Sequence, residues 1–171
     1  TRRSSDLNLY TCVTRLKSWG VQVTYQGRAE DDAKIVAGHI RRAAENADIL
    51  ITTGGVSVGK KDIMHEVLQI LDCQKLFWGV QIKPGMPTLC ALYQGKPLIC
   101  LSGNPYGAAV NLELLIRPVL AKMSGRYDLA IKRIMAVCDS EFLKMSHVTR
   151  YVRARCADGH VKIADGSNDS G

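Results

Sequence analysis

The chain has 171 residues, of which 46% are hydrophobic and 23% charged, and its formal net charge is +7. This length suits one domain and part of a second. No apolar run approaches the roughly 20 residues that span a bilayer, so we expect a cytoplasmic protein without a membrane segment. The positive charge favours anionic partners. However, the basic residues are scattered and no aromatic stripe accompanies them, which argues against nucleic-acid binding.

Cysteine and histidine spacing gives no sign of a zinc site or a thioredoxin-like motif. The six cysteines never form a C-x-x-C pair, and the four histidines share no metal-ligand spacing. Most of the cysteines stand within apolar runs, where a free thiol behaves as a small hydrophobic side chain. We therefore expect buried, reduced cysteines, in agreement with a cytoplasmic setting.

Helical and strand patterns alternate along the first part of the chain. Apolar residues recur at helical spacing in three stretches, and a short, wholly apolar run has the composition of a buried parallel strand. The expected elements are, in order, a helix with Asn8 as N-cap and Gly20 after its end, a strand over 21–25, a helix capped by Asp31 or Asp32 with its apolar residues facing inward, a strand over 49–52 and a helix over 63–71.

The second part begins with a strand over 75–82 and a turn of type II geometry at Lys83-Pro84-Gly85-Met86-Pro87. A hairpin over 88–101 follows. Asn104 is expected to cap, and Pro105 to begin, a long helix that Pro118 kinks near residue 114. After it come β-prone stretches over 131–138, 149–156 and 161–164.

This order of elements predicts an α/β fold, namely a three-layer α/β/α domain with a mostly parallel mixed sheet, followed by part of a small β domain. We place the boundary at 124–126, so that residues 1–125 form the first domain and 126–171 the second. Ligands bind at the carboxyl ends of the strands in such sheets. The loops 27–32, 52–62 and 102–105 are expected at that edge.

A glycine-rich loop follows the strand at 49–52, with the sequence Thr-Thr-Gly-Gly-Val-Ser-Val-Gly-Lys-Lys-Asp over residues 52–62. Gly54, Gly55 and Gly59 allow the backbone to turn successive amides toward one anion. The loop suggests a binding site for a phosphorylated small molecule, with Asp62 as a magnesium ligand. A glycine-rich turn without any ligand is the plain alternative.

Two other motifs fit the same loop less well. As a P-loop it has Lys61 where a magnesium-binding Ser or Thr belongs. As a nucleophile elbow it would use Ser57, with Asp139 and His147 further along the chain, but too many residues separate Ser57 from the next helix.

Charged groups are expected at the same edge of the sheet. The start of the helix at Asn104 and the ammonium of Lys83 can bind an anion. Asp31 and Asp62 can share one magnesium ion with phosphate oxygens. Each also has a plain explanation, because either aspartate can cap a helix and Lys83 can be a solvated turn residue.

Taken together, five motifs resemble those of the molybdopterin molybdotransferases, the family that includes the E domain of gephyrin. They are Asp6-Leu7-Asn8, Asp31-Asp32, Thr53 to Asp62, Lys83-Pro84-Gly85 and Gly103-Asn104-Pro105. The resemblance implies insertion of molybdenum from molybdate into adenylylated molybdopterin, with release of AMP and a requirement for Mg2+. It also implies that the full-length protein is a homodimer. Its expected binding partner is a small-molecule pterin phosphate, not nucleic acid or a membrane.

The resemblance assigns roles to particular residues. Asp31, Asp62 and Lys83 would be catalytic, and Asp31 and Asp62 would hold the metal. The residues expected to bind the adenylylated molybdopterin are Thr53, Gly54, Gly55, Ser57, Gly59, Ser102, Gly103, Asn104 and Pro105.

The chain also departs from the family pattern. Gly79 and Met86 stand where the family usually has lysines, and Ser102 replaces a proline. The family's first strand does not precede Thr1, so we expect a fragment whose α/β domain lacks that strand and exposes a sheet edge. The loss of the lysines favours one alternative, a scaffold that binds a partner protein without turnover. A related molybdopterin-binding or adenylylating enzyme is another.

Overall fold

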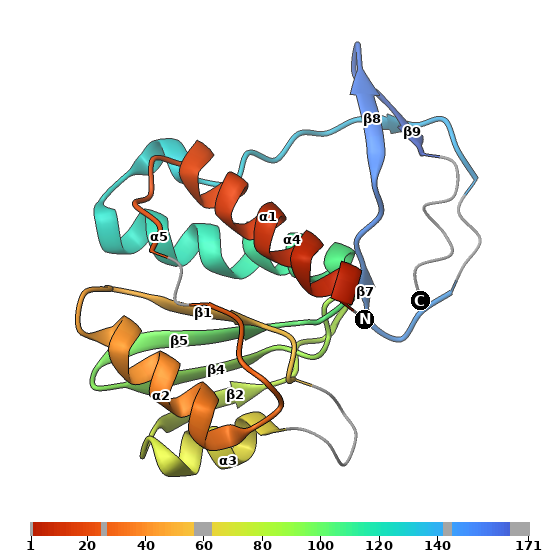
Figure 1. Ribbon diagram of the computed structural model, residues 1–171. Coiled ribbons are helices and arrows are strands. Elements are labelled where there is room, and N and C mark those ends of the chain that lie inside the picture. The colour runs from red at the N-terminus through yellow and green to blue at the C-terminus, as the bar shows by residue number, and fades with distance from the viewer. Residues whose placement is uncertain (1, 25–26, 57–62, 142–144, 165–171) are drawn as a thin grey trace.

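The computed structural model has an α/β domain of three layers, followed by short strands (Figure 1). It describes residues 2–24, 27–56, 63–141 and 145–164, with only the backbone for 2–6. The helices are α1 (Arg2–Ser18), α2 (Ala33–Ala44), α3 (Ile63–Ile70), α4 (Pro105–Asn111) and α5 (Arg117–Ser124). None of these helices is long and apolar enough to cross a membrane, as far as the described residues go.

The main sheet has four strands in the order β1 (Leu50–Thr53), β5 (Lys96–Leu101), β4 (Leu89–Tyr93) and β2 (Gln74–Trp78). β1 and β5 are parallel, whereas β5 with β4 and β4 with β2 are antiparallel. The α/β class with a mixed sheet is therefore confirmed. The described sheet is less parallel than expected because the hairpin supplies two antiparallel pairs and residues 21–24, predicted as a strand, form an irregular segment.

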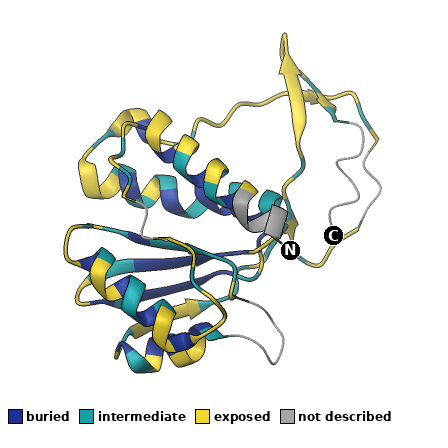
Figure 2. Cartoon of the chain, in the orientation of Figure 1, coloured by how far each residue is buried: buried dark blue, intermediate teal, exposed yellow. Residues whose placement is uncertain are grey.

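Helices cover both faces of this sheet. Figure 1 shows α1, α4 and α5 on one side and α2 and α3 on the other. Strand β5 contributes to both layers, because Leu98 and Cys100 pack with α2 and α3 while Ile99 and Leu101 pack with α1 and α4. All four side chains are buried, and Figure 2 shows the same burial along the strands. Burial on both faces explains why the strand sequences are almost wholly apolar.

The capping of α2 is as predicted, but that of α1 is not. Asp32 is the N-cap of α2, and its Oδ1 accepts hydrogen bonds from the amides of Lys34 (2.8 Å) and Ile35 (3.0 Å). The side chain of Ile35, expected to face inward, is 44% exposed. Asn8 was wrongly predicted as an N-cap, since it lies inside α1, is only 1% exposed and donates to Gly103 O at 2.9 Å.

The long helix starts where the sequence predicts. Asn104 Oδ1 accepts hydrogen bonds from the amides of Tyr106 (2.9 Å) and Gly107 (3.1 Å), and Pro105 is the first helical residue. A π-helical segment, Leu112–Ile116, separates α4 from α5. It lies just before Pro118, whose ring cannot fit against a regular preceding turn, so the irregularity falls in the expected place.

The remaining strands follow α5 or lie beside the Lys83 turn. β6 (Val137–Cys138), β9 (His160–Ile163) and β8 (Ala154–Ala157) form a small sheet in that order, and β3 (Ile82–Lys83) pairs in parallel with β7 (Thr149–Arg150). The boundary at 124–126 stays a prediction.

The cysteines are all free thiols. Cys12, Cys90 and Cys100 are buried as expected, but Cys138 and Cys156 are exposed because they lie in the small sheet. Burial raises the pKa of Cys12 to about 11, because a thiolate is poorly solvated inside the core.

Candidate functional site

The glycine-rich loop leaves the carboxyl end of β1 through two residues of positive φ. Gly54 has φ +81° and Gly55 has φ +71°, values that glycine adopts without a steric penalty. The Gly54 amide donates to Leu101 O at 3.1 Å, so it continues the pairing with β5 and does not face a ligand. Val56 is buried in the core. Amides for an anion must therefore come from Gly55 onward, and Ser57, Gly59 and Asp62 lie outside the described residues.

The loop before α4 lies directly against the first loop. A Cβ on Gly103 would stand 3.7 Å from Gly54 Cα, which is ordinary van der Waals contact. Ser102 is buried, and its hydroxyl accepts from the Asn104 amide at 3.2 Å. The structure thus brings together Thr53, Gly54, Gly55 and the segment 102–105.

The start of α4 is less suited to anions than the sequence suggests. Its amides at Tyr106 and Gly107 already donate to the Asn104 side chain. An anion would have to displace this cap, and replacing a capping side chain costs about 1 kcal/mol. We therefore regard segment 102–105 as a wall of the site more than as its anion donor.

The Lys83-Pro84-Gly85 loop packs against the first turn of α4. A Cβ on Gly107 would lie 3.1 Å from Gly85 N and 3.2 Å from Gly85 Cα, so only glycine permits this approach without movement. Gly85 O accepts from Asn111 Nδ2 (3.1 Å) and Thr88 Oγ1 (2.8 Å). The Lys83–Pro84 bond is cis, which differs from the type II turn that we expected.

Arg150 is the residue of this edge that sequence reasoning missed. Strand β7 lies beside β3 with Lys83 opposite Arg150, and the Tyr151 amide donates to Lys83 O at 2.8 Å. Partner residues in a parallel pair project to the same face, so the two half-buried cations are neighbours. The arginine-rich stretch 149–156 was visible as a strand, but nothing local to it indicates this pairing.

Asp31 is exposed and stands next to the capping residue of α2. Since Asp32 is the N-cap of α2, helix capping does not explain Asp31. In the described part of the chain, no group of three His, Cys, Asp or Glu side chains could hold a metal. A magnesium site with few protein ligands still fits, because Mg2+ commonly uses one or two carboxylates with phosphates and water.

Three buried polar atoms near these loops lack partners among the described residues, namely Asn8 Oδ1, Thr52 Oγ1 and Asn111 Oδ1. Asn8 contacts Gly103 through its amide nitrogen, and Thr52 lies in β1 two residues before Gly54. Buried polar atoms are nearly always hydrogen-bonded, so a bound ligand or water is expected to satisfy them.

The nucleophile-elbow interpretation receives no support from its other two residues. Asp139 Oδ1 lies 2.9 Å from Nδ1 of His160, and the two residues belong to the region of β6 and β9. His147, the histidine that this interpretation required, is exposed.

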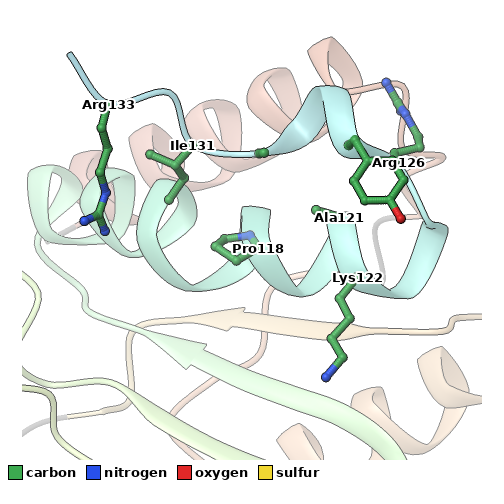
Figure 3. A pocket seen from close by; sticks show the side chains of 8 residues that line it. Pro118, Ala121, Lys122, Arg126, Ile131 and Arg133 are labelled. Atoms are coloured by element: carbon green, nitrogen blue, oxygen red, sulfur yellow. The ribbon is translucent and has the colours of Figure 1, made fainter.

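A cavity of about 400 Å³ lies between α5 and residues 126–133, and none of the predicted site residues lines it. Figure 3 shows that Lys122, Arg126 and Arg133 point in different directions around it. Arg126 pairs with Asp128 at 2.5 Å and holds the pKa of that carboxyl below its usual value, mainly through their hydrogen bond. These cations do not converge, so the cavity is a poor anion site.

Three loops that meet at one end of a mixed sheet define a ligand-binding α/β domain. The family model described as a probable molybdopterin binding domain matches residues 1–122, so the chain belongs to this family.

Two curated relatives are molybdopterin molybdenumtransferases, one from Staphylococcus aureus (strain COL) and one from Staphylococcus epidermidis (strain ATCC 12228 / FDA PCI 1200). The first is 34% identical over 155 residues and the second 34% identical over 158 residues. The matches cover 89% and 91% of this chain but only 37% and 38% of the relatives, so the chain spans less than two fifths of their length. The predicted family is confirmed.

Solved structures agree on the fold. A molybdopterin biosynthesis moeA protein from Pyrococcus horikoshii has a TM-score of 0.77 at 22% identity. The match covers 95% of this chain and 39% of the Pyrococcus horikoshii chain. A molybdenum cofactor biosynthesis protein from Pyrococcus furiosus has a TM-score of 0.67 at 20% identity, and the match covers 90% of this chain and 50% of that protein.

Proposed function

We propose that this chain is the ligand-binding α/β part of a molybdopterin molybdotransferase. The whole protein would transfer molybdenum from molybdate to adenylylated molybdopterin and release AMP. The observation that carries the proposal is the contact of three loops at one sheet edge, made through Gly54 with Gly103 and through Gly85 with Gly107. Such a junction forms a continuous rim for one elongated ligand.

The glycine-rich loop and segment 102–105 would hold the adenylylated molybdopterin. Gly55 is exposed at the start of the loop, and a Cβ on Gly54 would meet nothing within 4 Å, so a ligand can approach the backbone closely there. Ser57 and Gly59 would continue this surface. Asn8 Oδ1, which has no partner among the described residues, would accept a hydrogen bond from the ligand or from water.

Asp31 and Asp62 would hold Mg2+, whose charge would neutralise the pyrophosphate link of the substrate. Asp31 suits this role because it is exposed and does not cap α2. The two carboxylates would be the protein ligands of the ion, and oxygen donors of this kind are the ligands that magnesium prefers.

Lys83 and Arg150 would hold molybdate. The pairing of β3 with β7 places the two cations opposite each other, and a dianion is attracted to both. Arg150 also supplies positive charge where Gly79 and Met86 lack the lysines usual in the family. Fixed charges of this kind stabilise a developing anion without reorganisation during the reaction.

Calorimetric titration with AMP, with and without Mg2+, tests the proposal. We expect AMP to bind more weakly without the metal. In Asp62→Ala and Asp31→Ala the affinity for AMP should fall about tenfold or more, because a charge-assisted contact contributes about 1.5–3 kcal/mol. Asp48→Ala is the matched control, since Asp48 is exposed at the other end of β1.

Equal AMP affinity in all of these proteins would contradict the enzyme assignment. Binding of a partner protein that ignores Asp62→Ala would instead favour the scaffold. For the full-length protein we also expect a homodimer, which sedimentation measures directly.

A further inference from the structure

Residues 149–153 touch the candidate site although they follow α5 by many residues. The Thr149 amide donates to Gln81 O at 3.2 Å and the Tyr151 amide to Lys83 O at 2.8 Å. These bonds join β7 to β3, but each strand has only two residues. A two-stranded pair of this length is not stable alone, so other contacts must hold it.

Tyr106 provides two such contacts from the first turn of α4. Its hydroxyl donates to Tyr151 O at 3.1 Å, and the guanidinium carbon of Arg153 lies 4.7 Å from the centre of its ring. Tyr151 is thus bonded on both sides, by its amide to Lys83 and by its carbonyl to Tyr106. A cation over an aromatic ring at this distance is an attractive arrangement.

The position of Tyr106 is itself fixed by the cap of α4. Its amide donates to Asn104 Oδ1 at 2.9 Å, so the side chain that caps the helix also holds the backbone of Tyr106 in the first turn. Burial raises the pKa of the Tyr106 hydroxyl more than the charge of Arg153 lowers it. The hydroxyl therefore stays protonated and acts as the donor.

We propose that Tyr106 is a positioning residue that docks segment 149–153 against the Lys83 loop and so holds Arg150 beside Lys83 for anion binding. The anion-binding part rests on the proposed function. The docking itself rests only on the four contacts above. Without Tyr106, the two backbone hydrogen bonds between β7 and β3 remain, and so short a strand pair is not stable alone.

Hydrogen exchange at the Thr149 and Tyr151 amides measures the docking. We expect exchange about tenfold faster in Tyr106→Ala, which loses both contacts, and about threefold faster in Tyr106→Phe, which keeps the ring. Arg153→Gln removes the cation from the other side and should also speed exchange. Tyr127→Ala is the control, because Tyr127 is 93% exposed and should leave these amides unchanged.

Titration with molybdate measures the consequence for the site. We expect about tenfold weaker binding in Tyr106→Ala, partial recovery in Tyr106→Phe and unchanged affinity for AMP in both variants. A purely structural role would lower both affinities together.

Unchanged exchange in Tyr106→Ala would overturn the docking role, and faster exchange with unchanged molybdate affinity would overturn the positioning role. If the unmodified protein binds no molybdate, the proposed molybdate site is wrong, and the exchange data still decide whether Tyr106 docks the segment.

Discussion

Replacing Gly85 by alanine should destabilise the protein more than the same change at Gly95. Both glycines have positive φ, +104° and +77°, so each alanine carries backbone strain of about 1–3 kcal/mol. At Gly95 the new methyl group meets nothing within 4 Å. At Gly85 it would lie 2.5 Å from Asn111 Oδ1 and 3.1 Å from Gly107 O, so the fully buried Asn111 must move.

Movement of Asn111 breaks its bond to Gly85 O, and an unsatisfied buried group costs about 1–3 kcal/mol. We therefore expect Gly85→Ala to lower the free energy of unfolding by about 1–3 kcal/mol more than Gly95→Ala. Urea unfolding followed by circular dichroism measures both values, provided that the slope against urea is the same. Equal losses in the two variants would refute the close packing of the Lys83 loop against α4.

Gly38→Ala should stabilise α2 by up to about 1 kcal/mol through helix propensity, whereas Gly107→Ala should lose that gain to overpacking against the Lys83 loop, and comparison of their urea midpoints decides. Burial raises the pKa of Cys12 to about 11 from 9.0. The contribution of the protonated Cys12 thiol to the free energy of unfolding is therefore present below about pH 9 and is lost as the pH rises through about 11. Between these pH values the free energy of unfolding should fall about 2–3 kcal/mol further than in Cys12→Ala. The same dependence of the free energy of unfolding on pH in both proteins would contradict this. Arg150→Gln and Lys83→Gln should each weaken molybdate binding about tenfold, and unaltered affinity in both would exclude this pair of cations as the molybdate site.

Local sequence signals were reliable where local interactions determine the structure. Asp32 and Asn104 cap helices through amides two and three residues away, and the hairpin turn at Gln94 and Gly95 uses two residues of positive φ. Each feature depends on neighbouring residues, so its pattern can be read directly from the chain.

The failures involve contacts between distant parts of the chain. Asn8 has the residue type of an N-cap, but its side chain is buried against Gly103 and belongs to the packing of α1 on the site loops. Arg150 stands in an unremarkable basic stretch and joins the site only through the pairing of β7 with β3. Burial and strand pairing override local preference in both cases.

The motifs identified the loops of the candidate site but not which backbone amides are available to a ligand. The helix N-terminus at Asn104 suggested an anion site, whereas the Asn104 side chain already accepts hydrogen bonds from the amides of Tyr106 and Gly107. The glycine pattern likewise suggested that the Gly54 amide faces an anion, although this amide donates to Leu101 O. Motif spacing cannot indicate which amides are already bonded within the protein.

A crystal structure of the protein with AMP, Mg2+ and molybdate tests the central claim most directly. The account predicts the AMP phosphate at the glycine-rich loop beyond Gly54, next to Gly103, and molybdate between Lys83 and Arg150. Ligands found instead in the cavity beside α5, with the three loops empty, would contradict it.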